Sequence, residues 1–247
     1  MNTPATPAIG ARKIHPADTT FRLSLHGAGS VVVIVLLSIL AIMFIGGKLA
    51  FDTFGVGFIW GTEWNPVTKI YGALPAITGT LVTSLLALCI AWPIGFGIAF
   101  FLTEICPERI RGPLGIAIEL LAAVPSIVYG MWGFFVLAPF MSEYVQPWLT
   151  ATFLWIPPIG DSFFWFTAPP IGVGMLTAAL ILAVMILPFI AATTRDVLLS
   201  TPQLLKDGAY AMGATRWEAL TGVVIPAVRG SLFGAVFLGL GRALGET

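Results

Sequence analysis

The amino-acid sequence predicts an all-α integral membrane protein, built as a polytopic bundle of five membrane-spanning helices. Of its 247 residues, 57% are hydrophobic and only 10% are charged, whereas a soluble domain carries about 25% charged residues. The mean hydropathy is +0.96. Several apolar runs reach the roughly 20 residues that a helix needs to cross the hydrocarbon core. The net charge of zero and the lack of a basic tract give no electrostatic basis for binding nucleic acid.

The N-terminal part of the chain predicts one isolated span. Residues 1–29 are polar and are expected to form a cytoplasmic tail, and residues 30–51 are expected to form the first transmembrane helix. A cleaved signal peptide is the alternative. The long polar lead and the absence of a small-residue cleavage site favour an uncleaved anchor. Residues 52–72 are rich in aromatic and turn residues and predict a loop at the membrane interface.

Four more spans are expected in the rest of the chain. They cover residues 73–103, 113–141 and 169–194, and the last begins at Gly230. Pro125 interrupts the third span, and a loop is expected over residues 142–168. The sequence stops within apolar residues of the fifth span. We therefore expect a truncated chain from which a sixth span is missing.

The longest polar interruption of the apolar sequence is PQLLKDGAYAMGATRWEALTGVVIP, residues 202–226. This segment, called the hairpin below, predicts two short helices around Gly213, because glycine can take the left-handed conformation that ends a helix. Pro202 suits the first position of the first helix, where no backbone donor is needed. Ser200 or Thr201 would then be its cap.

The second helix of the hairpin is expected to begin at Thr215. Thr215 and Glu218 have the S/T-x-x-E spacing of a capping box, in which each side chain accepts a hydrogen bond from a backbone N–H at the helix start. Pro226 is expected to end the segment, because proline cannot continue the helical hydrogen bonding. The charges of the hairpin exclude it from hydrocarbon, so we expect it at a membrane surface, within reach of a soluble protein.

Lysine and arginine predict the orientation of the chain in the membrane. Nine of the twelve lie in the tail and in alternate connections, which the positive-inside rule places in the cytoplasm. Lys48 and Lys69 lie on the other side, and Arg242 lies inside a span. The nine cytoplasmic residues are Arg12, Lys13, Arg22, Arg109, Arg111, Arg195, Lys206, Arg216 and Arg229.

Three ionisable residues, Glu119, Arg242 and Glu246, are expected at membrane depth, where a charge normally faces a protein interior or a wet path. Arg242 and Glu246 are four residues apart and could simply pair on one helix. Alternatively, Arg242 lines a translocation path and presents its guanidinium fork to an oxyanion, while Glu246 holds the fork in place. Glu119 either lines the same path or extends to the cytoplasmic surface.

The break at Pro125 brings two further polar residues, Ser126 and Tyr129, to membrane depth. Backbone groups freed by such a break must be satisfied by neighbouring helices or water, so broken spans commonly line cavities. Ser126 and Tyr129 are therefore candidates for the path. The alternative is a kink without a function.

Several motifs are missing. The sequence has no G-x-x-x-x-G-K-[ST] motif, so the chain itself is not expected to hydrolyse ATP. His15 and His26 have no partners at metal-ligand spacing, so we expect no metal and no cofactor. An intramembrane enzyme that uses Glu119 or Glu246 as an acid or base is a rival hypothesis, but no second catalytic group has a suitable spacing.

The hairpin also contains the pattern D-G-A-x3-G-x9-V-x-I-P, which resembles the EAA signature of ABC importer permeases, E-A-A-x3-G-x9-I-x-L-P. The matching residues are Asp207, Gly208, Ala209, Gly213, Val223, Ile225 and Pro226. The sequence departs from the signature with Asp for Glu and Gly for Ala at the first two positions. The resemblance implies that Asp207, Gly208, Ala209, Gly213 and Pro226 couple the chain to a separate ATPase.

Further runs resemble the permease of phosphate-specific ABC importers, and its PstC-type subunit more than its PstA-type partner. They are GALPAITGTLVTSL (72–85), ELLAAVPSIVYGMWG (119–133), DGAYAMGATRWE (207–218) and GLGRALGET (239–247). The resemblance covers residues 71–247. It implies an ABC permease transmembrane domain of the type I importer (MetI-like) kind, incomplete at its C-terminus and with six spans when complete.

The resemblance also implies a function and a set of partners. The chain would be an inner-membrane permease subunit for inorganic phosphate. It would assemble with a PstA-like permease, an ABC ATPase dimer and a periplasmic phosphate-binding protein. A permease for another oxyanion, sulfate or molybdate, is the alternative within transport, because it would use the same hairpin.

Overall fold

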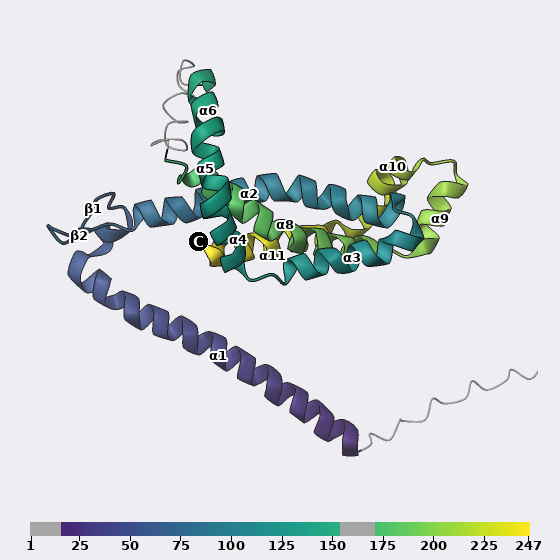
Figure 1. Cartoon of the computed structure of the whole chain (residues 1–247). Coiled ribbons are helices and arrows are strands. Elements are labelled where there is room, and N and C mark those ends of the chain that lie inside the picture. The colour runs from purple at the N-terminus through teal and green to yellow at the C-terminus, as the bar shows by residue number, and fades with distance from the viewer. Residues whose placement is uncertain (1–15, 154–170) are drawn as a thin grey trace, which may run out of the picture. The chain divides into compact units, whose positions relative to one another are not determined.

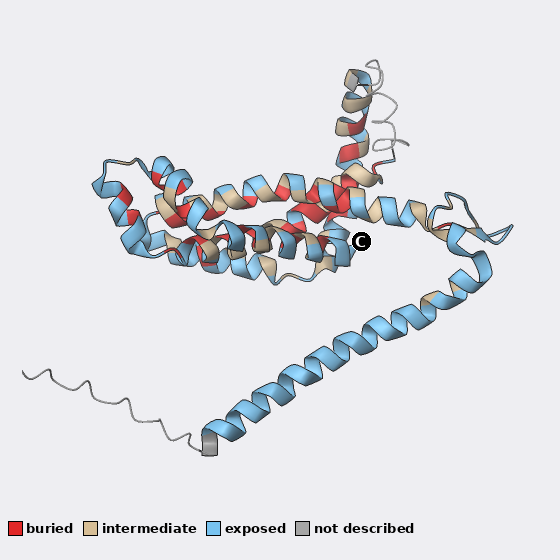
Figure 2. Ribbon diagram, turned by 180° about the vertical axis from the view of Figure 1, so that it is seen from behind, coloured by how far each residue is buried: buried red, intermediate tan, exposed pale blue. Residues whose placement is uncertain are grey.

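The computed structural model describes residues 16–153 and 171–247. The chain divides into two compact units, residues 1–74 and residues 75–247. In the first unit, α1 (Pro16–Phe54) is a single helix of 39 residues. Its side chains are exposed along almost its whole length, as Figure 2 shows in pale blue. An exposed apolar helix of this length is suited to a lipid environment.

The first unit is more ordered than the sequence predicts. The helix expected over residues 30–51 extends back to Pro16, and the segment Asp18–Phe54 is long and apolar enough to cross a membrane. The connection expected as a loop over residues 52–72 holds a 3₁₀ turn (Val56–Ile59) and a small antiparallel hairpin of β1 (Trp64–Asn65) and β2 (Ile70–Tyr71). The rings of Trp64 and Tyr71 meet edge to face across this hairpin, with centroids 5.0 Å apart.

Three long helices form the centre of the second unit (Figure 1). They are α2 (Leu74–Phe100), α8 (Met175–Leu199) and α11 (Ile225–Glu246). A π-turn, η2 (Phe101–Ile105), continues α2, and each of the three stretches is long and apolar enough to cross a membrane. Together with α1, they account for four of the five expected spans.

Ile190 of α8 lies where α2 and α11 both pack closely against α8. Its side chain is fully buried. A Cβ added at Gly95 of α2 would lie 3.0 Å from it, and one at Gly239 of α11 only 2.8 Å from it. Small residues at such contacts let helices pack closely in a membrane. The buried residues, red in Figure 2, concentrate along this inner face.

The remaining expected span is sharply bent. The helix α3 (Glu108–Ala122) ends before Pro125, and the helical stretch Ser126–Thr152, which begins with α4 (Ser126–Trp132), is bent from it by 84°. Pro125 lacks an N–H and restricts the residue before it, so the helix cannot continue straight. The interruption expected at Pro125 is therefore confirmed.

Three expected boundaries were wrong. The third span begins at Glu108 rather than at Pro113, which lies inside α3. After α4, helical structure continues through η3 (Gly133–Leu137), α5 (Ala138–Phe140), η4 (Met141–Val145) and α6 (Gln146–Phe153). The first part of the loop expected over 142–168 is thus helical, and its rest lies outside the described residues. The fourth span runs over Met175–Leu199 instead of 169–194.

The fifth span begins earlier than expected because Pro226 does not end the hairpin. A short helix, α10 (Arg216–Ala219), continues through the π-turn η5 (Leu220–Val224) into α11, and residues 216–246 form one helical stretch. Pro226 lies at the start of α11. The π-turn widens the helix just before the proline, where the missing N–H would otherwise interrupt regular bonding.

Candidate functional site

The hairpin lies at one end of the 75–247 unit, beyond the ends of α2 and α8 (Figure 1). Its first helix is α9 (Gln203–Ala211). Pro202 precedes this helix in an extended conformation rather than occupying its first position, and no side chain caps it. The Ser200 hydroxyl instead donates to the carbonyl of Val197, so the expected Ser200 or Thr201 cap was wrong.

The turn and the second helix follow the sequence prediction. Gly213 has φ +86°, the left-handed region that favours glycine, and its N–H donates to the carbonyl of Tyr210. The capping box is complete: the Glu218 N–H donates to Thr215 Oγ1, and the Thr215 N–H donates to the Glu218 carboxylate at 2.8 Å. Both predictions are confirmed.

The helix α9 buries the charge of Lys206 and leaves large apolar side chains exposed. Only 6% of Lys206 is exposed, whereas Leu204 is 81% exposed and Met212, just after the helix, is 90% exposed. A surface helix usually buries its large apolar side chains. An exposed apolar patch indicates a surface that binds another molecule.

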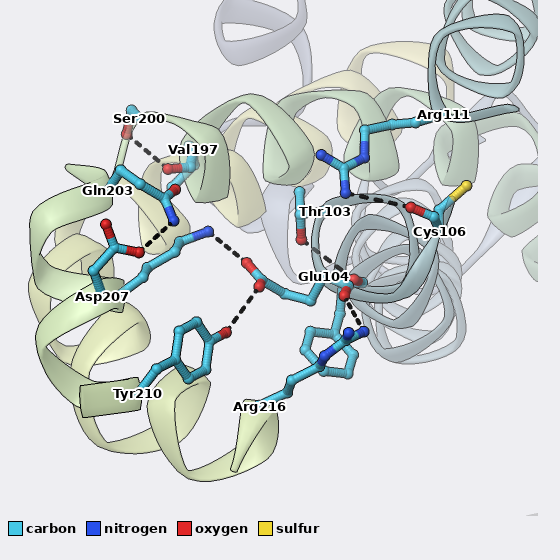
Figure 3. Close-up of polar contacts among 12 residues, drawn as sticks. Thr103, Glu104, Cys106, Arg111, Val197, Ser200, Gln203, Asp207, Tyr210 and Arg216 are labelled. Carbon is cyan, nitrogen blue, oxygen red and sulfur yellow. Dashed lines mark hydrogen bonds and ion pairs between the residues drawn. The ribbon is translucent and has the colours of Figure 1, made fainter. Parts of the chain in front are cut away.

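Glu104, in the π-helical turn after α2, accepts three hydrogen bonds from the hairpin. Its Oε1 accepts a hydrogen bond from Lys206 Nζ at 2.5 Å, and its Oε2 accepts one from Tyr210 Oη at 3.3 Å. Its main-chain carbonyl accepts one from Arg216 Nη1 at 2.6 Å. Figure 3 shows Tyr210 and Arg216 reaching Glu104 from the two hairpin helices.

The protonation of Tyr210 suits this contact. Partial burial raises the pKa of Tyr210 above its usual value of 10.0, and the charge of Glu104 and the hydrogen bond to it raise it further. The phenol therefore remains protonated at neutral pH and donates its hydrogen to the carboxylate.

The five expected coupling residues lie at different places in the hairpin. Asp207 and Gly208 are exposed on α9, where Gln203 Nε2 donates to Asp207 Oδ1 at 3.0 Å. Ala209 is buried on the opposite face. Gly213 forms the turn, and Pro226 lies in α11, away from that turn along the chain. The exposed pair Asp207 and Gly208 is accessible to a partner.

The expected path residues come together only in part. Ser126 and Glu246 line one hollow of about 350 Å³ between α4, α8 and the end of α11. Tyr129 does not line it: its hydroxyl donates to the Leu121 carbonyl at 2.9 Å and satisfies an acceptor at the break in the helix. Most of the hollow is apolar, lined also by Ile127, Gly130, Ala178, Ile181, Leu182, Met185 and Thr247.

Arg242 and Glu246, both among the described residues, form no ion pair, so the pairing considered from their spacing and the expectation that Glu246 holds the Arg242 fork in place were both wrong. The Arg242 guanidinium carbon lies 5.5 Å from the centre of the Phe189 ring, a cation–π arrangement. Arg242 Nε is buried without a hydrogen-bond partner. Glu246 is exposed.

Glu119 lies closer to the hairpin end of the unit. Its Oε1 accepts a hydrogen bond from Arg195 Nη1 at 2.9 Å, which joins α3 to α8. The guanidinium lies over Gly115, where a Cβ would come within 2.6 Å of Arg195 Nη1. Glu119 thus pairs with a cation instead of facing the hollow.

Sequence reasoning missed Glu104, Lys206 and Tyr210 as a group. Lys206 and Tyr210 are four residues apart on one face of α9, a spacing visible in the sequence. Nothing in the sequence indicated that Glu104, 102 residues before Lys206, would meet them. In the described part of the chain, no three His, Cys, Asp or Glu side chains gather to hold a metal ion.

These features, an all-α bundle of membrane-length helices with a polar hairpin at one end, define a polytopic membrane protein. The family described as "Binding-protein-dependent transport system inner membrane component" matches residues 93–247, and the chain belongs to this family. The predicted MetI-like fold class is thereby confirmed.

Individual relatives carry a more specific name. The "Phosphate transport system permease protein PstC" of Xylella fastidiosa (strain Temecula1) is 50% identical over 244 residues, covering 98% of this chain and 74% of the relative. Proteins of the same name are 48% identical in Mesorhizobium japonicum, covering 96% of this chain and 71% of theirs, and 47% identical in Pasteurella multocida, covering 94% and 72%. The resemblance to PstC-type permeases is confirmed.

Proposed function

We propose that this chain is a permease subunit of an ATP-driven importer that moves inorganic phosphate across the plasma membrane. The identity of 47–50% to transport permeases named for phosphate, over nearly the whole chain, supports this substrate. ATP hydrolysis takes place on a separate subunit, and the chain itself is not an enzyme. Sulfate and molybdate are the competing substrates, because an oxyanion path would use the same fold.

The hairpin is the proposed docking site for the ATPase. The observation that carries this proposal is the exposure of Leu204 and Met212 beside the exposed carboxylate of Asp207, at the end of a membrane bundle. Apolar side chains at such a surface are stabilised when a partner covers them. The other proposed partners are a PstA-like permease and a periplasmic phosphate-binding protein, and the N-terminus is cytoplasmic.

The proposed path for the anion involves the hollow at Ser126 and Glu246 together with Arg242. The unpartnered Nε of Arg242 retains hydrogen-bonding capacity, and a guanidinium matches the geometry of an oxyanion. Tyr129 supports the break in the helix, and the Glu119–Arg195 pair joins α3 to α8 beside the hairpin.

Uptake by the assembled transporter tests the substrate. We expect labelled phosphate to accumulate in cells that express the chain with its partner subunits. A tenfold excess of unlabelled sulfate or molybdate should leave this uptake within about twofold of the value measured without competitor. Phosphate carries a hydroxyl at neutral pH that sulfate and molybdate lack, and a transporter selective for phosphate discriminates by such a group. Inhibition by sulfate or molybdate comparable to that by unlabelled phosphate would instead identify another oxyanion as the substrate.

Co-purification tests the docking surface. Leu204→Asp places a charge in the proposed interface, and we expect it to lower the amount of ATPase recovered with the chain by about tenfold, the usual scale for an interface anchor. Leu204→Met is the matched control, because it keeps an apolar side chain of similar volume. Equal recovery of the ATPase with both variants would exclude Leu204 from the interface.

Labelling of an introduced cysteine tests the orientation. Lys206 is buried, so Met212→Cys, at a 90% exposed position, is the better probe. The exposed native Cys89 is first replaced by serine. We expect a membrane-impermeant maleimide to label Met212→Cys in inside-out vesicles from cells that express the chain without the ATPase, and not in intact cells. Labelling in intact cells would place the hairpin outside and exclude contact with a cytoplasmic ATPase.

A further inference from the structure

Glu104 connects both helices of the hairpin to the end of α2. Lys206 and Tyr210 of α9 donate to its two carboxylate oxygens, and Arg216 of α10 donates to its carbonyl. Among the described residues, the bonds from Lys206 and Tyr210 to Glu104 are the only side-chain hydrogen bonds that α9 makes to another helical segment. One residue of the second span therefore contacts the hairpin on both sides of its turn.

The Glu104–Lys206 pair is shielded from water. The Glu104 side chain is 10% exposed and the Lys206 side chain 8% exposed. Charges in such a site interact strongly, because solvent screens them little. Removing one partner leaves the other charge buried and uncompensated, whereas an exposed surface pair can be lost with little effect. The pair consequently holds α9 in one place relative to α2.

The backbone on either side of α9 does not hold this helix in place. Pro202, with ψ 130°, separates it from α8, and Gly213, with φ +86°, separates it from α10. Both junctions are bends at which the helical hydrogen bonding stops. By contrast, α10 continues through η5 into α11. The orientation of α9 therefore depends on its side-chain contacts.

A ring contact adds to the connection between α2 and the hairpin. Phe100 of α2 meets Trp217 of α10 edge to face, with ring centroids 5.9 Å apart. Phe100 lies four residues before Glu104, on the same side of the helical stretch. Both residues therefore meet the hairpin.

From these contacts we infer that Glu104 is a positioning residue, which transmits the movement of α9 to the second span, α2. The inference rests on the proposed function, in which an ATPase moves the hairpin. A displacement of α9 is transmitted through the Glu104–Lys206 pair to α2. The bend at Pro202 weakens the transmission of the same displacement to α8. Without the pair, α9 still moves and ATP is hydrolysed, but less of this movement reaches α2 through the contacts that remain.

The test uses the complete transporter, reconstituted in vesicles with its ATPase and phosphate-binding protein, and measures phosphate taken up per ATP hydrolysed. We expect Glu104→Gln to lower this ratio by about tenfold while ATP turnover stays within about twofold, because the buried lysine loses its counter-charge. Exchanging the charges, with Glu104→Lys and Lys206→Glu together, should restore most of the ratio. The matched control is Glu108→Gln, the same change at an exposed carboxylate four residues away.

The outcomes separate this inference from the proposed function. A wild-type complex that takes up no phosphate contradicts the proposed function. A wild-type complex that transports, with the ratio unchanged in Glu104→Gln, contradicts the role of Glu104 alone. If Glu104→Gln fails to assemble with the ATPase, the double variant with Glu104→Lys and Lys206→Glu decides. The inference is supported if this variant recovers both assembly and the ratio of phosphate taken up to ATP hydrolysed. It is overturned if the variant recovers assembly alone, or neither.

Discussion

The hairpin end and the opposite end of the 75–247 unit use their polar side chains in different ways (Figure 1). At the hairpin end, Glu104 pairs with Lys206 and Glu218 with Thr215, so these charged groups hold the hairpin together, and the buried atoms without a partner nearby, Arg111 Nε and Thr201 Oγ1, belong to side chains outside it. At the other end, Glu246 is exposed in a hollow, and Arg242 Nε is buried without a partner.

This difference separates two tasks. A buried polar group without a partner costs roughly 1–3 kcal/mol, so it persists where it can bind something else. Charged groups that are paired within a segment give it a defined shape that can transmit a movement. The comparison is consistent with the two proposed roles, a rigid end for contact with the ATPase and an adaptable end for contact with the anion.

The largest effect is expected at the turn of the hairpin. Gly213→Val forces a β-branched residue into the left-handed conformation, which costs about 1–3 kcal/mol in strain and displaces the turn. Because a Cβ at this position meets open space, the cause is the backbone and not a clash. We expect phosphate uptake to be abolished while the chain still inserts into the membrane.

Gly213→Asn is the matched control for this change, because asparagine enters the left-handed region more readily than most residues. It should retain most of the uptake. Normal uptake by Gly213→Val would show that the rigid end does not depend on the shape of this turn.

The next largest effect is expected at the opposite end. Arg242→Ala removes the guanidinium, and we expect uptake to fall by about tenfold, the scale of one charged hydrogen bond, while co-purification of the complex is unchanged. Arg242→Lys keeps the charge without the fork and should recover only part of the uptake. Unchanged uptake by Arg242→Ala would mean that the side chain serves only to pack against Phe189.

A smaller effect is expected from the capping box. Thr215→Ala removes the oxygen that accepts from the Glu218 N–H, and loss of such a cap destabilises by about 1 kcal/mol. The thermal midpoint of the purified protein in detergent should fall. Thr215→Ser retains the hydroxyl and should keep the midpoint close to that of the wild type. If Thr215→Ala and Thr215→Ser have the same thermal midpoint, the cap does not contribute to the stability of the rigid end.

The smallest effect is a stabilisation. Gly208 lies inside α9, and a Cβ added there meets no atom within 4 Å. Gly208→Ala should therefore raise the free energy of unfolding by up to about 1 kcal/mol through helix propensity alone. A rise in the thermal midpoint checks this expectation. A fall would mean that glycine is needed at this position for a reason other than space.

Residues close together in the sequence account for most of what could be predicted. Apolar runs of membrane length predicted the central helices, and Pro125 predicted the broken span. Gly213 and the spacing of Thr215 and Glu218 predicted the turn and cap of the hairpin. Each of these features depends on residues within a few positions of one another, where side-chain type and helical period determine the local conformation.

The sequence by itself thus determined the membrane class, the approximate spans, the turn and cap of the hairpin and the resemblance to ABC permeases. Only the tertiary structure decided that Glu104 meets Lys206, that Arg195 pairs with Glu119 and that the broken span bends by 84°. The structure also continues the helix through Pro226, where local sequence rules alone would end it. The physical reason is that a contact between residues far apart depends on how whole helices pack, and helical periodicity contains no information about which helices meet.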